Sequence, residues 1–529
     1  MTQQANDYRQ SRTYKRRWWT LAVLSLSILI VVIDNTILNV ALPTLQRELG
    51  ATGAELQWIV DAYILAFAAL LLTMGALGDR LGRAHLLKAG MLVFGAASLG
   101  AALAGSAEHL IAARVVMGIG AAMIMPATLA IITNVFPREE RGKAIGMWGA
   151  MNGAGVALGP ILGGVLIEHF DWSAIFLINI PIAVIAIVAG YFLVPNSSDP
   201  NPRRLDIVGT VVSTATLSVL VFGLIKGGDW GWGNPTVVGL LVGAVALGAL
   251  FVLWERRTTS PMLPIPLFNN QRFSAGVASI SSMGFIQFGI AFGFTLYMQF
   301  VQGYSALDTG IRFLPIALGV ALGSGTSHRR VARFGTKWVV GVGFVGVALL
   351  AIVASFWQAD TPYWQLGLVL FAFAFFMGNV IAPAVDSVLG AVPEARAGVG
   401  SAMNSVSVQV GGAIGIAALG SAISSVYASR IEPALAAIPN LPAEVVEAAR
   451  DSVGAAMTIA SKLPDALARP LAEAASNGFM DGWQVMGFVI CGVALVGAAL
   501  VFAFLPPRHL PVVETSDVPE AADPVKGGD

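Results

Sequence analysis

The sequence predicts an all-α integral membrane protein with fourteen transmembrane helices. Of its 529 residues, 56% are hydrophobic and only 12% are charged, which is about half the charged share of soluble domains. So few charges cannot cover the water-exposed surface of a soluble protein. Long apolar runs recur along the chain, each reaching the roughly 18 to 20 residues that cross a hydrocarbon core. The formal net charge is zero, which argues against a nucleic-acid-binding protein.

Short clusters of glycine, proline and charged residues bound each apolar run. The expected spans are 18–43, 56–77, 86–105, 108–135, 144–167, 174–194, 207–226, 236–254, 274–300, 310–328, 337–356, 364–389, 398–424 and 481–505. Strands are excluded because the runs are too long and do not alternate in polarity. The one long connection, 425–480, is rich in alanine. We expect one or two amphipathic helices there, as a cap over the outer mouth.

The distribution of positive charge predicts the orientation. An even number of spans places both termini on one side of the membrane. Most of the 31 Lys and Arg residues lie in the terminal segments and loops of that side. Because positively charged loops stay in the cytoplasm, residues 1–17 and the tail 506–529 are expected to be cytoplasmic, in a protein of the cell membrane. No small-residue cleavage site follows the first run, so we expect no removable signal peptide.

A short internal repeat divides the chain. The sequence Ala-Met-Asn, followed by two glycines at the same spacing, occurs in 150–164 and in 402–416, within the fifth and thirteenth spans. These positions are equivalent if residues 18–194 and 274–505 each form a bundle of six helices, with 207–254 inserted as two more. Transporters are often built from such repeats, with a substrate site between the halves.

The loop between the second and third spans reads Gly75-Ala-Leu-Gly-Asp79-Arg80-Leu-Gly82-Arg83. Its glycines allow a tight turn. Asp79 lies by helix ends, where it can accept hydrogen bonds from backbone N–H groups or from arginine. We interpret this loop as a latch that holds one conformation and releases in the other. The alternative is a charged turn that only fixes topology.

The fifth span carries Gly155, Gly159, Pro160, Gly163 and Gly164. Glycines four residues apart form a flat stripe that lets helices approach closely, and the proline adds a kink. Plain packing is the alternative interpretation. The two are compatible, because a sliding helix pair needs the same smooth face.

Three charged residues lie five or more residues inside a span: Asp34 in the first, Asp61 in the second and Arg114 in the fourth. Charges in the hydrocarbon core are costly and are therefore candidates for function. Our hypothesis is that Asp34 is the main proton carrier and that Arg114 modulates it. The alternative makes Asp34 a structural partner of Arg114. Asp61 could neutralise a cationic substrate, carry a second proton, or only touch water at the outer end of its helix.

These motifs resemble those of the major facilitator superfamily. The Gly75–Arg83 loop is similar to its signature loop, and residues 155–164 are similar to the fifth-span motif of its antiporters. The stretch from Leu110 to Gly120, with Arg114, resembles the fourth-span motif of proton-coupled members. Residues 34–43 resemble the first-span motif of the fourteen-span drug:proton antiporters, which include multidrug and quaternary ammonium compound efflux pumps.

The resemblance implies the major facilitator fold, with two six-helix bundles around a central cavity. It implies antiport powered by a proton gradient, without a cofactor or metal. The expected partners are the lipid bilayer, protons and small lipophilic or cationic substrates, with no nucleic acid, and the protein is expected to be a monomer. The subset of relatives with an acid at the position of Asp61 exports organic cations.

The cavity wall is expected to be apolar, aromatic and rich in methionine. Aromatic faces attract organic cations, and methionine adapts to varied shapes. The candidates for substrate contact are Asp61, Asn39, Trp58, Tyr63, Trp148, Met151, Gln287, Tyr297 and Asn404. Most such residues in membrane proteins only pack or face lipid. Lys226, which ends the seventh span, is expected to snorkel to the membrane surface.

No HExxH, GxSxG or P-loop motif is present, so neither an enzyme nor a nucleotide-driven pump is expected. The first hypothesis is a proton-coupled exporter of lipophilic, cationic compounds. The second is a dedicated exporter of a single natural product, lipid or metabolite. The third is a membrane sensor or scaffold that does not transport, which would not need the charged motifs described above.

Overall fold

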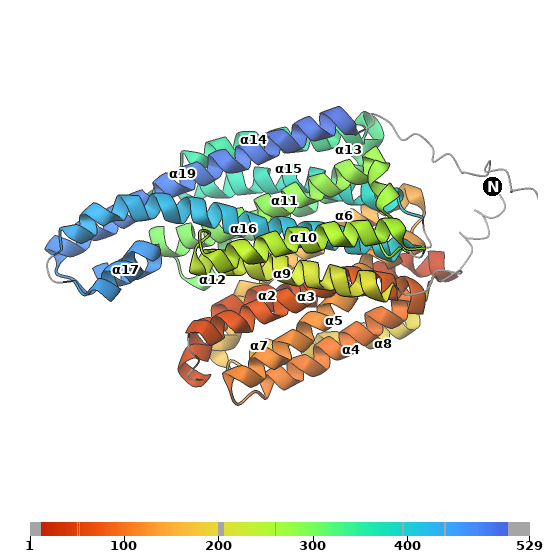
Figure 1. Cartoon of the computed structure of the whole chain (residues 1–529), viewed down its shortest axis with the longest axis horizontal. Coiled ribbons are helices and arrows are strands. Elements are labelled where there is room, and N and C mark those ends of the chain that lie inside the picture. Colours follow the sequence, from red (N-terminus) through yellow and green to blue (C-terminus); the bar gives the residue numbers. More distant parts are fainter. Residues whose placement is uncertain are drawn as a thin grey trace, which may run out of the picture.

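The structure, a computed structural model, describes residues 12–49, 51, 53–198, 206–259, 261–393, 396–438 and 441–505. All regular secondary structure in these ranges is helical. The helices form an elongated bundle and run roughly along its long axis (Figure 1).

Six spans make up the first half. They are α2 (Arg12–Leu49), α3 (Gly53–Leu81), α4 (Arg83–Ala102), α5 (Ala107–Val135), α6 (Arg138–His169) and the pair α7 (Ala174–Leu177) and α8 (Asn179–Leu193). The sixth span is thus interrupted at Ile178, directly before Asn179.

Two further helices follow the first half. They are α9 (Ile207–Trp230) and α10 (Pro235–Arg257). Helix α9 packs against α3 and α16, whereas α10 packs mainly against α9. Large apolar side chains of α10 are therefore exposed, among them Val242 and Val245, as expected for a helix that faces lipid.

The second half begins with the short helix η1 (Ile265–Asn269). It continues with α11 (Gln271–Leu296), which ends in a π-helical turn η2 (Tyr297–Val301), and with α12 (Ala306–Arg312), α13 (Leu314–Phe334), α14 (Thr336–Ser355), α15 (Tyr363–Gly390), α16 (Ala397–Ala436), α17 (Ala443–Asp451), α18 (Val453–Ala460) and α19 (Asp465–Phe504).

Thirteen helices of the described ranges are long and apolar enough to cross a membrane. The expected tenth span, α13, has 21 residues but is not one of them. Its glycines, hydroxyl residues and arginines lower its apolar share. The buried Gly319, Gly323 and Ser324 belong to the face that packs on α6 and α15, whereas Leu318 and Leu322 are exposed. The count of fourteen therefore stays a prediction.

The connection expected at 425–480 is shorter in the structure. Helix α16 continues to Ala436 and α19 begins at Asp465, because the alanine-rich sequence favours helix. The added turns pack on each other, because Gly478 of α19 lies against Tyr427 and Arg430 of α16. Arg430 also pairs at 2.8 Å with Asp481, the first residue of the expected last span. The short helices α17 and α18 are present as expected, but they pack on the second half. Figure 1 shows α16, α17 and α19 projecting together beyond the other helices.

The fifth span packs on the first span in both halves. In the first half, a Cβ added to Gly159 of α6 would collide with Oγ1 of Thr36 of α2. In the second half, Gly411 and Gly415 of α16 lie against the backbone of Ser281 and Phe285 of α11. The glycines of the sequence repeat thus make equivalent close contacts.

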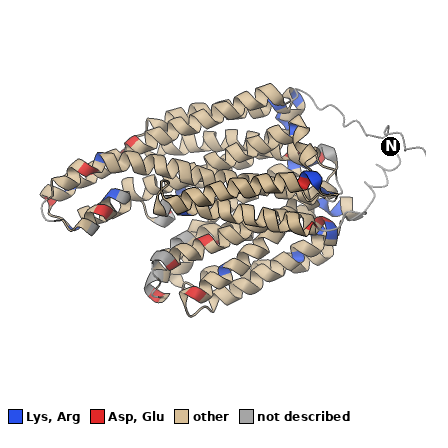
Figure 2. Ribbon diagram, in the orientation of Figure 1, with Lys and Arg blue, Asp and Glu red and all other residues tan. Residues whose placement is uncertain are grey.

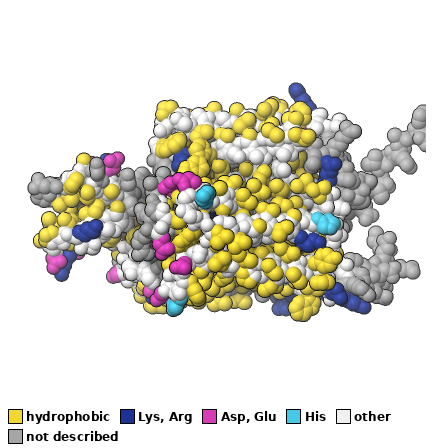
Figure 3. All heavy atoms as spheres, turned by 90° about the horizontal axis from the view of Figure 1, so that it is seen from below, with side chains coloured by type: hydrophobic (Ala, Val, Ile, Leu, Met, Phe, Trp, Pro, Cys, Tyr) yellow, Lys and Arg dark blue, Asp and Glu magenta, His cyan; other side chains and the backbone are white. Residues whose placement is uncertain are grey.

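Positive charge gathers at one end of the bundle (Figure 2). The residues there stand at the end of α3, the starts of α4, α6 and α16, and the end of α13, and include Arg80, Arg83, Arg141, Arg330, Arg333 and Arg396. We call this the basic end and the other the opposite end. Between them, hydrophobic side chains cover most of the middle of the face shown in Figure 3, as a lipid environment requires.

The two halves meet closely at the basic end. A Cβ on Gly75 of α3 would lie 2.5 Å from the Cβ of Ala402 of α16, and one on Gly146 of α6 would lie 2.5 Å from the carbonyl oxygen of Ser324 of α13. Only glycine allows backbones to approach so closely.

Candidate functional site

Asp34 and Arg114 face each other in the interior of the first half. Nη1 of Arg114, on α5, donates to Oδ2 of Asp34, on α2, at 2.5 Å, and both side chains are 0% exposed. Breaking such a pair is costly because it leaves an unbalanced buried charge. The structure thus brings together the two residues expected to form the proton-coupling pair.

Asn179 is a partner of Asp34 that the sequence analysis missed. Its Nδ2 donates to Oδ1 of Asp34 at 2.9 Å and to Oγ of Ser98, on α4, at 3.0 Å. Both Asn179 and Ser98 are buried. The available signal was that Asn179 is the one polar residue in the run 174–189.

Arg114 makes two further contacts, both with α3. Its Nε donates to the carbonyl oxygen of Ile59 at 3.0 Å, and its guanidinium carbon lies 4.2 Å from the ring centroid of Tyr63. Tyr63, expected to touch substrate, is therefore part of the Asp34 site. Nη2 of Arg114, Oη of Tyr63 and Oδ1 of Asn179 are buried without a hydrogen-bond partner.

Asp61 and Trp58 lie on α3 toward the opposite end, where α9 packs. Asp61 is half-buried. The ring of Trp58 stacks on Phe222 of α9 at a centroid distance of 6.0 Å. Lys226 of α9 is also turned toward α3, with Nζ 3.5 Å from Oε1 of Gln57. Because Lys226 is only 7% exposed, the expectation that it snorkels to the membrane surface is wrong.

Trp148 and Tyr297 are packed inside separate halves. Nε1 of Trp148 donates to Oγ1 of Thr128 at 3.3 Å. Tyr297 lies in an aromatic cluster with Trp357 and Trp483, apart from the Asp34 group.

The remaining candidates for substrate contact differ in burial. Met151 and Gln287 are half-buried. Asn404 is buried, and its Oδ1 has no partner. Asn39 belongs to α2, but its side chain lies outside the described residues.

Asp79 joins the two halves at the basic end. It accepts from Nε of Arg83 at 2.8 Å, and from the backbone N–H groups of Gly398 and Val399 at 2.9 and 3.2 Å. Those two N–H groups open α16, so the carboxylate lies at the positive end of its helix dipole. The hydrogen-bond acceptor expected in this loop therefore reaches across to the second half.

The turn beside Asp79 depends on glycine. Gly82 has a φ of 103°, in the left-handed region that a side chain disfavours. A Cβ there would also lie 2.5 Å from Oδ1 of Asn196, and that oxygen accepts from the N–H of Ala84. Arg80 is exposed, whereas Arg83 is buried.

The glycine motif of α6 fits closely against α2. A Cβ on Gly159 would collide with Oγ1 of Thr36. Pro160 lies inside α6 and faces Gly310 of α12 in the second half. Gly163 is buried and Gly164 is half-buried.

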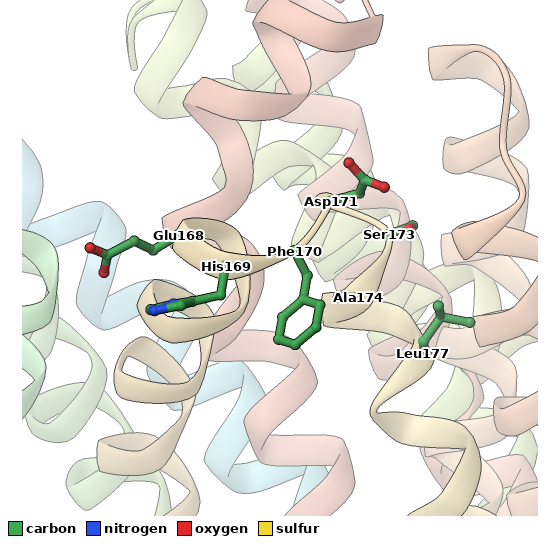
Figure 4. A pocket seen from close by; sticks show the side chains of 7 residues that line it. All are labelled: Glu168, His169, Phe170, Asp171, Ser173, Ala174 and Leu177. Atoms are coloured by element: carbon green, nitrogen blue, oxygen red, sulfur yellow. The ribbon is translucent and has the colours of Figure 1, made fainter.

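A surface hollow of about 560 Å³ lies at the turn between α6 and α7. Figure 4 shows that Glu168 and Asp171 point in different directions around it. Within the described ranges, no group of three or more His, Cys, Asp or Glu side chains could hold a metal ion.

The comparisons with known proteins decide the family. The model of the Major Facilitator Superfamily matches residues 24–416. The chain belongs to this superfamily. As a major facilitator it is a multi-pass membrane protein and a secondary transporter rather than an enzyme.

Similar proteins include the "Multidrug efflux pump LfrA" of Mycolicibacterium smegmatis, which is 36% identical over 89% of this chain and 93% of its own length. The "Tetracenomycin C resistance and export protein" of Streptomyces glaucescens is 34% identical, over 90% and 89% respectively. The "Methyl viologen resistance protein SmvA" of Salmonella typhimurium is 34% identical, over 88% and 93%.

A solved structure supports the fold assignment. The human organic anion transporter MFSD10 (TETRAN) aligns with a TM-score of 0.61 at 16% identity, over 93% of this chain and all of its own. At this identity the likeness shows the major facilitator fold alone.

Proposed function

We propose that this major facilitator is a proton-coupled antiporter that exports lipophilic, cationic drugs across the cell membrane by alternating access. It acts as a monomer, with the basic end and both termini in the cytoplasm. The observation that supports proton coupling is the fully buried Asp34–Arg114 pair. The multidrug efflux and methyl viologen resistance named for two relatives support the substrate class.

Protonation of Asp34 drives the conformational change in this proposal. While Asp34 is charged, it balances Arg114 and holds α2 against α5. A proton that arrives from the outside neutralises the carboxylate and leaves Arg114 without its counter-ion. Loss of one member of a buried pair changes the free energy by about 3–5 kcal/mol, which is enough to favour another packing of these helices.

Asp61 supplies the negative charge for a cationic substrate. It stands near Trp58, whose aromatic face attracts organic cations, and α9 packs against this part of α3. Asp79 and α16 hold the basic end closed while the cavity faces the outside.

The decisive experiment follows proton movement in proteoliposomes with an imposed pH gradient, using ethidium as the substrate. We expect ethidium to drive proton movement with the wild type and not with Asp34→Asn. Asp308→Asn is the matched control, because Asp308 is 51% exposed and its partners among the described residues are all nearby. Ethidium-driven proton movement by Asp34→Asn at the wild-type rate would remove Asp34 as the carrier.

A dedicated exporter of one natural product is the second candidate. It is favoured by the relative named for tetracenomycin C resistance and export and by the "Puromycin resistance protein pur8" of Streptomyces alboniger. In that case well-folded wild type gives no signal with ethidium, and a panel of natural products yields one compound that drives proton movement.

A further inference from the structure

The hydrogen-bond partners of Asp34 fit only its charged form. Oδ2 accepts from Arg114 and Oδ1 accepts from Asn179, so both partners donate. A protonated Asp34 would carry an O–H that needs an acceptor, because a buried donor without one is costly. A proton carrier must be stable in both its charged and its protonated form. The described contacts stabilise only the charged form of Asp34.

Asn179 holds the missing acceptor. Its Oδ1 is buried and has no partner, while its Nδ2 bonds both Asp34 and Ser98. A half-turn of the amide about Cβ–Cγ exchanges Oδ1 and Nδ2 with little change in shape. Ser98 tolerates the turn, because a hydroxyl can accept from Nδ2 or donate to Oδ1.

We infer that Asn179 is a positioning residue whose amide turns over with each protonation of Asp34, so that the carboxyl keeps a hydrogen bond in both states. A hydronium ion gives its proton to Oδ1 of Asp34 and becomes water, and the new O–H donates to Oδ1 of Asn179. No covalent bond of the protein breaks. This inference rests on the proposed role of Asp34 as the proton carrier.

The surroundings make Asn179 the group that changes. The titratable and charged groups that act on this site within the described residues are Arg114 of α5 and Tyr63 of α3. Arg114 has only donors and keeps its charge, so it cannot accept from a protonated Asp34. Asn179 stands at the break between α7 and α8, where α8 packs on both α2 and α4. One amide thus reaches Asp34 and Ser98 together.

Infrared difference spectroscopy of the full-length protein in liposomes tests the inference. The carboxylic acid band of Asp34 is identified by its loss in Asp34→Asn. In wild type grown with isotope-labelled asparagine, we expect an asparagine carbonyl band to shift with the same midpoint pH as the Asp34 band. That asparagine band should be absent from Asn179→Leu.

The pH midpoint gives a second readout. Asn179→Leu removes a charge-assisted bond from ionised Asp34 and a neutral bond from protonated Asp34. The first is about twice as strong, so the variant favours the protonated state. We expect the midpoint of the Asp34 band to rise by about half a unit to one unit. Asn179→Thr, whose hydroxyl can both donate and accept, should restore it toward the wild-type value.

Asn379→Leu is the matched control. Asn379 is also a buried helical asparagine, bonded to Arg330 in the second half, and its replacement should leave the midpoint unchanged. An unchanged midpoint in folded Asn179→Leu, or no labelled asparagine band that follows Asp34, overturns the inference while Asp34→Asn still abolishes coupling. If Asn179→Leu does not fold, the labelled wild-type band decides. Normal coupling by Asp34→Asn instead overturns the proposed function, and this inference with it.

Discussion

Asp79 is a single residue that binds groups from both halves. It takes hydrogen bonds from Arg83 four residues later and from two N–H groups of α16. Asp308 and Arg312 form a pair with the same spacing, but Asp308 is 51% exposed and its described partners are local. A comparison of variants at Asp79 and Asp308 therefore separates the loss of an ion pair from the loss of a link between the halves.

Asp79→Ala should slow exchange about tenfold, because charge-assisted hydrogen bonds contribute about 1.5–3 kcal/mol each. Substrate affinity should change little, since the substitution is at the basic end. Two quantities are measured: the rate of substrate exchange in proteoliposomes and the equilibrium affinity for substrate. Asp308→Ala should exchange substrate at the wild-type rate. The same rate for Asp79→Ala would contradict the latch interpretation.

Asp61→Asn should weaken the export of cations more than that of neutral compounds. The substitution removes one formal charge beside Trp58, and we expect a loss of about tenfold for ethidium, or roughly 1.4 kcal/mol. Efflux of ethidium and of a neutral dye is compared in the same vesicles. An equal loss for both would make Asp61 a coupling or structural residue instead.

Sequence reasoning identified Asp34 and Arg114 because a charge inside an apolar run has a high cost and stands out. It missed Asn179 because a single amide in such a run is less costly, and because its role arises only when α8 packs on α2. It gave Tyr63 as a candidate for substrate contact and did not foresee that Arg114 lies over the ring. Contacts between distant helices of this kind are not contained in any local pattern.

At the scale of elements, α6 connects the halves because it packs on α2 with one face and on α13 with another. Its glycines differ in how much room they leave. A Cβ on Gly159 would overlap Thr36, whereas one on Gly149 would lie 3.9 Å from Oγ of Ser324, an ordinary contact. Gly149, outside the motif, thus tolerates a side chain, whereas Gly159 of the motif does not.

Gly159→Ala should reduce transport strongly and lower the melting temperature, since overpacking costs about 1–3 kcal/mol. Gly149→Ala should leave both near wild type. Thermal unfolding in detergent and ethidium efflux are the measurements. Adding Thr36→Ala to Gly159→Ala should restore part of the lost transport and stability. If neither is restored, the close approach of α6 to α2 is not the reason that glycine is needed at this position.

The order and approximate position of the helices followed from hydropathy alone, but their lengths did not. Helices α16 and α19 extend past the expected bounds because they pack against each other outside the apolar runs, as the contact of Gly478 with Tyr427 and Arg430 shows. Helix α13 is less apolar than the other spans because glycine and serine residues form the face that packs on the protein and arginines stand at its basic end. Both differences reflect packing partners that a single helix sequence does not reveal.

At the scale of the whole molecule, the described contacts close the basic end. The cores of the two halves merge there, with residues such as Val399 and Ala402 packed into the core of the first half. The two-bundle architecture was predictable from the repeat and the motifs. The closed state was not, because both states of an alternating-access cycle share one sequence.

Locking the basic end should stop transport. A Cβ on Gly142 would lie 3.4 Å from that of His328 in the other half, close to the spacing of a disulfide. The double variant Gly142→Cys, His328→Cys, in a Cys491→Ser background, should cross-link on mild oxidation. Ethidium exchange should then cease and return with reductant, whereas neither single-cysteine variant should respond. A formed cross-link with undiminished exchange would contradict the closed-end interpretation.

The inserted helices lie over one of the two lines along which the halves meet. Helix α9 packs on α3 of the first half and on α16 of the second, and after it Nε1 of Trp232 donates to Oγ of Ser421 on α16 at 2.5 Å. The line between α6 and α13 has no such cover within the described helices. A molecule dissolved in the bilayer therefore meets α9 when it approaches from one flank and meets the halves directly from the other. The inserted helices therefore separate one of these two lines from the lipid and leave the other in contact with it.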